Sequence, residues 1–434
     1  MSLPPPDAYT ENLAVVNETN SVLASEDIVN AQGILVAKKG TPINKRIAAK
    51  LMTFKLTKPL ESSVSVDNEI NGNTLLLNLR DFLRKNEELQ QLHDRVNLEA
   101  ILPSLASAID RYPVIRQKLT VMSIILKEQY QQCLFSAWLA SVIGLRMRYS
   151  REQVQTLFLA GITHDLGMVH ISAELLNKKE QLTPEEWRQI QAHPIISQKI
   201  LAAIENLPKE VVTAALEHHE RADGSGYPAG RHGNELSPFG QVIGMTDTFQ
   251  GAWRGQARNG SVSLRNLIPV LQMNAETHFY HTYETLVTLL RQSGLGDNTH
   301  ITHGTLSAQI QRFNALKEPL TCDISKLSRI TTVFPNDHKE RELHAISAAL
   351  RRCLNSVAGS GILDEGYARW LQQVEKEKLV FAYRELEDAL LMLNELKFQV
   401  SHILRSVQAY VEFGKNRKLA STIAGELKSF ALAS

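Results

Sequence analysis

The spacing of apolar residues along the chain predicts a protein built mainly of α-helices. Through residues 75–145 the apolar positions recur every three or four residues, which is the period of one helix face. The same spacing returns in residues 264–290 and again in residues 339–432. Within the last region, residues 379–410 keep charges between the apolar positions, a pattern typical of a long helix in a bundle or dimer seam.

The first seventy residues carry a different pattern, with short apolar runs separated by turn residues. Residues 34–36 and 64–66 are expected to be strands, and Gly40 marks a turn between them. Asn44 precedes a helical stretch and is expected to cap it. We therefore expect a small α/β module over residues 1–70.

Helix signals are clearest in the middle of the chain. Ser150 with Gln153 fits a capping box, and Thr183 with Glu186 fits another. A third helix is expected to begin near Pro208 and to end at the two histidines that precede a loop rich in Gly and Pro.

These patterns predict a mainly α fold, with a helical bundle between the N-terminal module and a C-terminal helical region. A length of 434 residues suits two or three domains. We expect a helical region over residues 71–290, a linker or irregular segment over residues 291–338, and the C-terminal helical region over residues 339–434.

The overall charge is nearly balanced, with 47 Lys and Arg residues against 46 Asp and Glu residues. Because no basic stripe with interleaved aromatic residues occurs, we expect no binding of nucleic acid. No window approaches eighteen uninterrupted apolar residues, and the start of the chain lacks the pattern of a signal peptide. A cytoplasmic protein without membrane association is the expectation.

Histidine and aspartate residues in the middle third suggest a metal site. Imidazole and carboxylate ligands suit Fe, Mn, Zn or Ni without distinguishing them. A pair of such ions, about 3.5–4 Å apart, clamps phosphoester oxygens and makes hydroxide at neutral pH. The pattern therefore indicates phosphoester hydrolysis, with these candidate ligands in chain order: His164, Asp165, His193, His218, His219 and Asp247.

A single His-Asp pair is a weak signal, and the chain contains its own comparison. His93 and Asp94 lie in a polar helical stretch without downstream partners, so we expect them on the surface. His300 and His303 are spaced like ligands but lie in a polar segment, and we expect them to be a decoy of the same kind.

Together with these ligands, several short runs resemble the HD-GYP family of HD phosphohydrolases. They are His164-Asp165-Leu166-Gly167, residues 182–187, His193-Pro194, His218-His219-Glu220, residues 223–228 and Asp247. The resemblance covers about residues 124–290. It implies an all-α domain that holds two or three metal ions and hydrolyses cyclic di-GMP.

The resemblance also implies a role for each ligand. His164, Asp165 and Asp247 would serve one divalent transition-metal ion. Asp165 would bridge to a second ion held by His193, His218 and His219. His164 and Asp165 would be the catalytic pair, and the loop formed by Gly226, Tyr227 and Pro228 would border the substrate cleft.

The chain departs from the family at positions that bind the substrate phosphates. Met168 stands in place of a lysine that contacts phosphate, and Ile124 and Glu128 stand in place of a Glu and a His. Glu128 stays a candidate metal ligand through oxygen. The basic segment after the last ligand is missing, so Arg254 and Arg258 are the candidates to replace it, although a solvated surface Arg is the more common reading.

Two hypotheses of different class follow. The first is a phosphodiesterase that hydrolyses cyclic di-GMP, or a related phosphoester, at a two-metal site. The second is a catalytically weak or inactive receptor or signalling scaffold for cyclic di-GMP. The C-terminal helices are candidates for binding a protein partner or for dimerisation. A nucleotidase of the wider HD superfamily would use the same ligands, but the intact Gly-Tyr-Pro loop argues against it.

Overall fold

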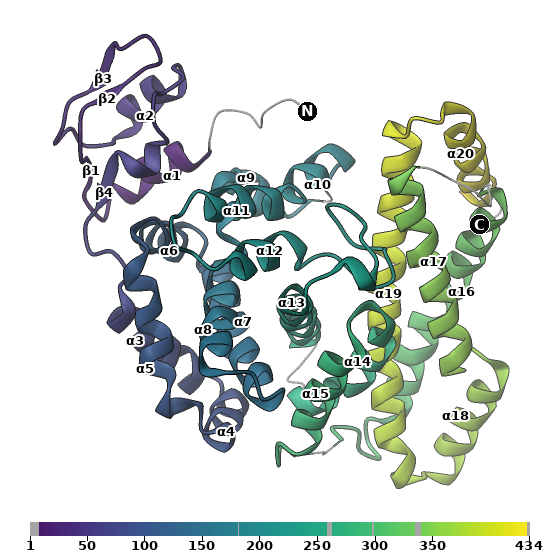
Figure 1. The fold of residues 1–434 in the computed structure, drawn as a ribbon. Helices are drawn as coiled ribbons and strands as arrows, with labels where there is room; N and C mark the ends of the chain where they lie inside the picture. The colour runs from purple at the N-terminus through teal and green to yellow at the C-terminus, as the bar shows by residue number, and fades with distance from the viewer. Residues whose placement is uncertain (1–7, 181, 258–262, 297–298, 335–339, 432–434) are drawn as a thin grey trace. The chain divides into compact units, whose positions relative to one another are not determined.

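The computed structural model describes residues 8–180, 182–257, 263–296, 299–334 and 340–431, and most of them are helical (Figure 1). The chain divides into two compact units. The first contains residues up to His219 together with Ser237–Asp247, and the second contains Glu220–Leu236 and Thr248–Ser434. All six candidate ligands belong to the first unit.

The first unit begins with the small α/β module. Two antiparallel strand pairs form it, and helix α2 begins at Asn44, whose side chain accepts a hydrogen bond from the Ile47 N–H group. The expected cap and strands are confirmed, with strand β3 displaced by one residue from the expectation. The elements are α1 (Ala8–Val16), β1 (Val22–Ala24) paired with β4 (Val64–Val66), β2 (Ile28–Val29) paired with β3 (Leu35–Ala37), and α2 (Lys45–Met52).

Helices make up the remainder of the first unit. Helix α7 is buried around most of its surface, and α8 packs along it because Gly161 leaves space there. A Cβ atom at Gly161 would lie 2.6 Å from the Cα atom of Ala137. The helices are α3 (Gly72–Arg84), α4 (Glu87–Val96), α5 (Leu102–Ala106), α6 (Pro113–Ile125), α7 (Lys127–Arg146), α8 (Arg151–Thr163), α9 (Ala173–Leu176), α10 (Pro184–Ile190), α11 (His193–Ala202), α12 (Lys209–Glu217) and the first half of α13 (Pro238–Ala257).

Both expected capping boxes are present, at Ser150 before α8 and at Thr183 before α10. Each satisfies backbone N–H groups that the first turn of a helix leaves without partners. Helix α8 therefore begins at a defined residue, and its length then fixes where His164 follows its last turn.

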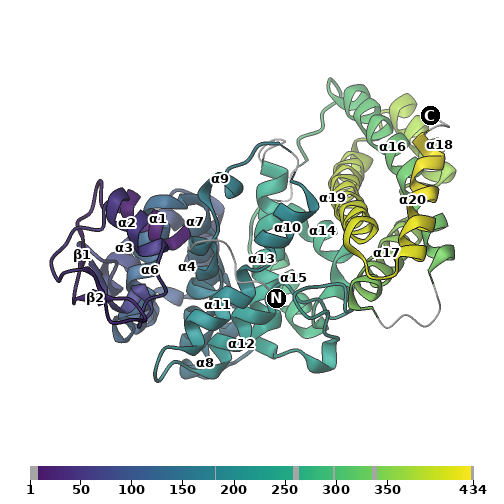
Figure 2. The same cartoon turned by 90° about the horizontal axis from the view of Figure 1, so that it is seen from above.

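The second unit is a bundle in which α16, α17 and α20 surround α19 (Figure 2). A continuous apolar core runs between them, and Phe313, Leu350, Leu393 and Ile423 are fully buried in it. Its helices are the last turns of α13, then α14 (Ile268–Met273), α15 (Tyr280–Arg291), α16 (Leu306–Val333), α17 (Arg341–Ser360), α18 (Glu365–Glu377), α19 (Tyr383–Phe413) and α20 (Arg417–Ala431). The long helix expected over residues 379–410 is confirmed as α19.

The expected linker over residues 291–338 is wrong for most of its length, because α16 occupies Leu306–Val333. One face of α16 carries apolar residues at helical spacing, and these are buried in the core of the bundle. Polar residues between them and Pro319 within the helix conceal this spacing in the sequence. The division between the two units falls inside residues 124–290, so the other expected domain boundaries stay predictions.

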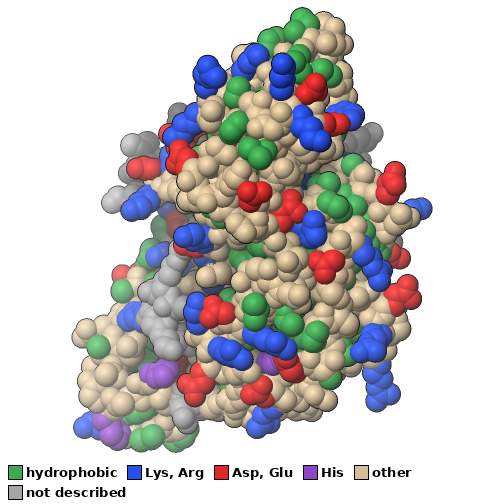
Figure 3. All heavy atoms as spheres, turned by 90° about the vertical axis from the view of Figure 1, so that its left-hand side faces the viewer, with side chains coloured by type: hydrophobic (Ala, Val, Ile, Leu, Met, Phe, Trp, Pro, Cys, Tyr) green, Lys and Arg blue, Asp and Glu red, His purple; other side chains and the backbone are tan. Residues whose placement is uncertain are grey.

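Charged side chains of both signs are interspersed on the face shown in Figure 3. Among the described residues, no helix is long and apolar enough to cross a membrane.

Candidate metal centre

His164 and Asp165 lie where α8 ends and a short 3-10 helix, η4 (Leu166–His170), begins. Both are almost completely buried. Gly167 lets η4 lie directly against the first turn of α11. A Cβ atom there would overlap the carbonyl oxygen of His193 and lie 2.8 Å from the Ser197 nitrogen. The Gly167 N–H group donates to Ser197 Oγ at 2.8 Å, which fixes this approach.

Three imidazoles share one orientation, set by the helix end on which each lies. In His164, His193 and His218, Nδ1 lies 2.8–2.9 Å from a backbone carbonyl oxygen three residues earlier. A carbonyl only accepts, so Nδ1 carries the hydrogen and Nε2 presents a lone pair. This is the tautomer in which histidine binds a metal ion through Nε2.

The three Nε2 atoms converge on the carboxylate of Asp165. His193 Nε2 lies 3.1 Å and His218 Nε2 lies 3.6 Å from Asp165 Oδ1, and His164 Nε2 lies 3.5 Å from Asp165 Oδ2. The Nε2 atoms of His193 and His218 are 3.1 Å apart. Asp165 therefore lies between His164 on one side and the other two imidazoles on the other, as a bridging carboxylate would.

Asp165 Oδ1 is a buried acceptor without a hydrogen bond in the described part of the chain. Its approach to His193 Nε2 becomes a hydrogen bond only if that ring carries a hydrogen on both nitrogen atoms. Leaving such an atom unsatisfied is costly in a protein interior. A cation placed among these lone pairs would satisfy Asp165 and the imidazoles together.

The protonation states also suit a metal ion. Burial raises the pKa of Asp165, but the imidazoles of His164 and His193 act more strongly together and hold it well below its usual range. Burial lowers the pKa of His218 to about 4, so this imidazole is neutral at pH 7. Metal ligands must be deprotonated to bind. The donor set of imidazole and carboxylate therefore fits borderline transition metals.

His219 and Asp247 form the more open side of the same region. His219 Nδ1 lies 3.5 Å from Asp247 Oδ2, and their side chains are 17% and 24% exposed. Helix α13 carries Asp247. Ligand atoms of His193, His218 and His219 all lie within 4.8 Å of one another, so these three could hold one ion.

A second group of three ligand atoms contains a residue that the sequence interpretation missed. Cys133 on α7 lies with His164 and Asp165 in a cluster where all ligand atoms are within 4.8 Å of one another. Burial raises the pKa of the Cys133 thiol well above its usual range. No motif marks Cys133, because an isolated cysteine in an apolar helix is usually only a core residue.

The remaining expected site residues are not gathered into these clusters. Glu128 is exposed in the first turn of α7. Arg254 is half-buried in the last turns of α13, and Arg258 lies outside the described residues. Met168 is half-buried in η4, and Ile124 is half-buried near the end of α6.

The loop with Gly226, Tyr227 and Pro228 belongs to the second unit, and its three residues are half-buried. Glu220 shapes this loop from within. Its carboxylate, only 1% exposed, accepts hydrogen bonds from the N–H groups of Ala229 at 2.6 Å and Arg231 at 3.0 Å. That the loop borders a substrate cleft stays a prediction.

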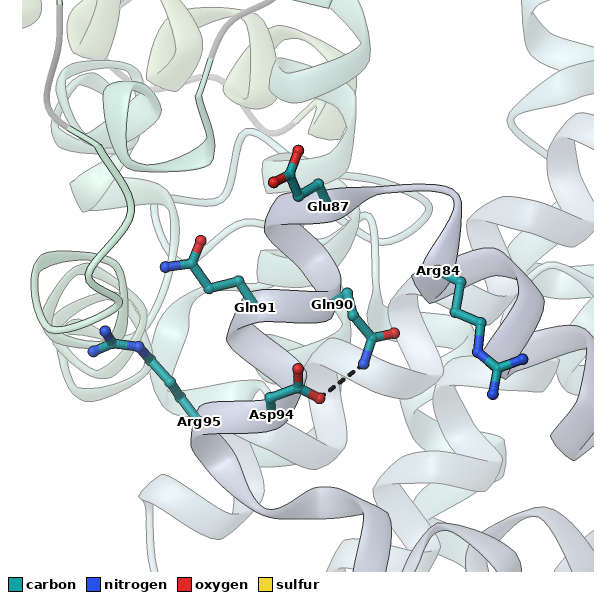
Figure 4. Close-up of a pocket in the computed structure, with 6 residues that line it drawn as sticks. All are labelled: Arg84, Glu87, Gln90, Gln91, Asp94 and Arg95. Atoms are coloured by element: carbon teal, nitrogen blue, oxygen red, sulfur yellow. Dashed lines mark hydrogen bonds between the residues drawn. The ribbon is translucent and has the colours of Figure 1, made fainter.

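The expected surface position of His93 and Asp94 is confirmed for Asp94 only. Asp94 is exposed, and Figure 4 shows it on α4 with the hydrogen bond that it accepts from Gln90. His93, however, is buried, so its expected surface position is wrong. Its ring accepts from Trp138 Nε1 at 3.3 Å and contacts Glu99 at 3.1 Å. It is a core histidine with satisfied nitrogen atoms.

Comparison with known proteins gives a consistent assignment. Residues 113–282 match the model of a family described as HD domain. The chain is 33% identical over 135 residues to 3'3'-cGAMP-specific phosphodiesterase 1 of Vibrio cholerae, covering 31% of this chain and 30% of the relative. It is 36% identical over 116 residues to a cyclic di-GMP phosphodiesterase of Thermotoga maritima, covering 26% and 31%.

The chain is also 28% identical over 215 residues to a probable cyclic di-GMP phosphodiesterase of Vibrio cholerae. This longer alignment covers 47% of this chain and 45% of the relative. The chain thus spans less than half the length of each of these three relatives. The matched segment contains every candidate ligand in the expected order. Residues 113–282 therefore match the HD domain family, and the sequence there is similar to that of these cyclic-dinucleotide phosphodiesterases.

Proposed function

We propose that this protein is a metal-dependent phosphodiesterase that hydrolyses cyclic di-GMP at a two-metal site. One observation carries the proposal: three imidazoles, each held by a hydrogen bond from Nδ1 to a backbone carbonyl, direct their Nε2 atoms at the buried carboxylate of Asp165, whose Oδ1 atom has no hydrogen bond among the described residues. Such a costly arrangement is easily explained by metal binding and poorly by packing. The names of the similar proteins support the substrate class.

The ligand roles follow from which atoms lie together. His193, His218 and His219 would hold one divalent ion, and His164 with Asp165 would hold the other. Asp165 would bridge the two ions. Asp247 and Cys133 are the candidates to complete the coordination of these ions. When bound, a pair of transition-metal ions supplies a hydroxide nucleophile at neutral pH and stabilises the charge that develops on the phosphate.

The protein's own contribution is to orient these groups and to exclude water from them. Each Nδ1–H group donates to the carbonyl oxygen of the residue three positions earlier, so the rings cannot rotate away without losing a buried hydrogen bond. Because Asp165 is held ionised, it cannot give up a proton, and its role is to bind and bridge. The more exposed pair, His219 and Asp247, leaves one side of the region accessible.

The test is turnover of cyclic di-GMP by the full chain loaded with Mn²⁺ or Fe²⁺, with 3'3'-cGAMP measured in parallel. We expect Asp165→Ala to reduce turnover by more than about 100-fold, because it removes the bridging ligand. Asp67→Ala is the matched control, since Asp67 is exposed. Turnover that survives Asp165→Ala would show that the active site lies elsewhere.

Metal content gives a readout that does not depend on activity. The wild-type chain and Asp67→Ala should each retain about two ions, and Asp165→Ala should retain fewer. Removal of the ions by a chelator should abolish turnover, and added Mn²⁺ should restore it. A wild-type chain that holds no metal, purified without chelator, would contradict the proposal.

A receptor or scaffold is the second candidate, favoured by the thioether of Met168 in η4, where the family carries a phosphate-binding lysine. It predicts that the chain binds metal and cyclic di-GMP without turnover. If the chain is an enzyme in which only the binding of the substrate phosphate is weakened, Met168→Lys should raise turnover. Leu77→Lys adds the same charge at an exposed apolar position on α3 and should leave turnover unchanged.

A further inference from the structure

The packing of α7 against α8 brings a cysteine beside the first two metal ligands (Figure 1). The two helices are joined by a short connection and run antiparallel. Their backbones approach most closely where Gly161 faces Ala137. One helical turn before Ala137 is Cys133, and one turn after Gly161 the chain reaches Asp165. The register of the helix pair therefore places Cys133 opposite Asp165.

The distances agree with this register. The ligand atoms of Cys133, His164 and Asp165 all lie within 4.8 Å of one another. The three residues are buried, with exposed fractions of 0%, 1% and 4%. A cysteine in an apolar helix is usually only a core residue. Here the sulfur instead lies beside an imidazole and a carboxylate, the two kinds of side chain with which thiolates share metal ions.

Asp165 gives independent evidence that a cation binds in this cluster. Its Oδ1 atom is buried and has no hydrogen bond within the described ranges, which is costly in a protein interior. Oδ1 faces His193 and His218, whereas Oδ2 lies 3.5 Å from His164 Nε2. An ion bound to Oδ1 therefore leaves Oδ2 for a second ion, on the side where His164 and Cys133 lie.

The number of protein ligands also differs between the two proposed ions. One ion has three imidazoles, as described above. The other has only His164 and Asp165, whereas three protein ligands and a water are usual for a catalytic zinc ion. Asp247 was the expected third ligand, but its Oδ2 atom lies 3.5 Å from His219 Nδ1. In the part of the chain that the structure describes, the close group around His164 and Asp165 contains Cys133 instead.

We infer that Cys133 is the third protein ligand of the ion held by His164 and Asp165, and that its sulfur makes this site prefer Zn²⁺, Fe²⁺ or Co²⁺ to Mn²⁺. The inference deepens the proposed function and rests on the two-metal site proposed there. Thiolate is a soft ligand that favours zinc and iron, whereas manganese prefers oxygen ligands. Burial raises the pKa of the thiol, so it keeps its hydrogen until a cation arrives. Binding then forms a metal–sulfur bond, and the S–H proton leaves to solvent.

The test is titration of the chelator-treated full chain with Co²⁺ in the absence of oxygen, followed by absorption spectroscopy. A bond between Co²⁺ and a thiolate gives a charge-transfer band in the near ultraviolet, which nitrogen and oxygen ligands do not give. We expect this band in the wild-type chain and its loss in Cys133→Ser. Cys353→Ser is the matched control and should keep the band, because Cys353 is also buried but belongs to the second unit.

Two further measurements separate metal binding from a merely structural role. Cys133→Ser should weaken Zn²⁺ binding by at least about 10-fold and Mn²⁺ binding much less, because only the soft ligand is lost. It should still bind one Co²⁺ at the three imidazoles, which shows that the variant is folded. If it does not fold, a chain in which Cys322 and Cys353 are both replaced by Ser keeps Cys133 as its only cysteine, and it should show the full band.

The outcomes distinguish this inference from the proposed function. A wild-type chain without the thiolate band, or a band that Cys133→Ser leaves unchanged, would overturn the inference. Equal losses of Zn²⁺ and Mn²⁺ affinity in Cys133→Ser would overturn it as well. If turnover of cyclic di-GMP is present in such a case, the proposed function stands without Cys133 as a ligand. The thiolate band without turnover would contradict the proposed function and leave this inference standing.

Discussion

Gly167→Ala tests how closely η4 must approach α11 for the metal centre to form. The new Cβ atom would overlap the carbonyl oxygen of His193 and lie 2.8 Å from the nitrogen and 2.9 Å from the hydroxyl of Ser197. Two of these atoms are backbone, so they cannot rotate away. Overpacking of this kind costs about 1–3 kcal/mol. Loss of the buried hydrogen bond from Gly167 to Ser197 adds about 0.5–1.5 kcal/mol.

We therefore expect Gly167→Ala to lower the free energy of unfolding by about 2–4 kcal/mol. It should also weaken metal binding about tenfold or more, because η4 follows Asp165 directly and α11 begins at His193. Urea unfolding followed by fluorescence, and metal titration of the chelator-treated chain, measure the two effects.

Gly251→Ala is the matched control for this substitution. Gly251 lies on α13, and a Cβ atom there would have no heavy atom within 4 Å. Alanine at a helix position with free space should stabilise the chain by about 1 kcal/mol or less. The two glycine substitutions are thus expected to have opposite signs. A Gly167→Ala chain with wild-type stability and wild-type metal affinity would refute the assigned contact between η4 and α11.

Two further predictions concern titratable groups. Burial and neighbouring arginines lower the pKa of His402 to about 4 in the folded chain, from an ordinary value of 6.5. Between these two pH values the unfolded chain therefore binds more protons than the folded chain. The free energy of unfolding should then fall as the pH is lowered from 6.5 to 4. His402→Gln should reduce that slope by up to about 1.4 kcal/mol per pH unit, measured by urea unfolding at several pH values; an unchanged slope would contradict the assignment. Among the three cysteines, exposed Cys322 should react with a thiol reagent in the native chain, whereas buried Cys133 and Cys353, whose pKa burial raises, should react only after unfolding. Mass spectrometry of the labelled peptides checks this, and rapid native labelling of Cys133 would contradict its buried position.

Much of the fold of the middle third could be predicted because its helix ends are specified locally. A capping box needs only residues three positions apart, and both boxes form as the sequence indicates. Asn44 acts in the same way before α2. The order of the ligands along the chain is likewise a local signal, since His164 and Asp165 are adjacent and lie at the end of a capped helix.

Burial was harder to predict than secondary structure, because it depends on contacts distant in sequence. His93 is covered by Trp138, which lies 45 positions later, and nothing near His93 indicates this. In the same way, α16 is stabilised by packing against α19, so its mixed polar pattern and internal Pro319 give a weak signal when the segment is considered alone. Tertiary contacts here override the local pattern.

The same distinction explains why six metal ligands could be predicted and Cys133 could not. Three of the imidazoles in the metal centre, those of His164, His193 and His218, are each oriented by the carbonyl three residues earlier, so residue type and local position contain most of the information. Cys133 is 31 positions from His164, and it joins the cluster only because α7 packs against α8, a contact that no local pattern indicates.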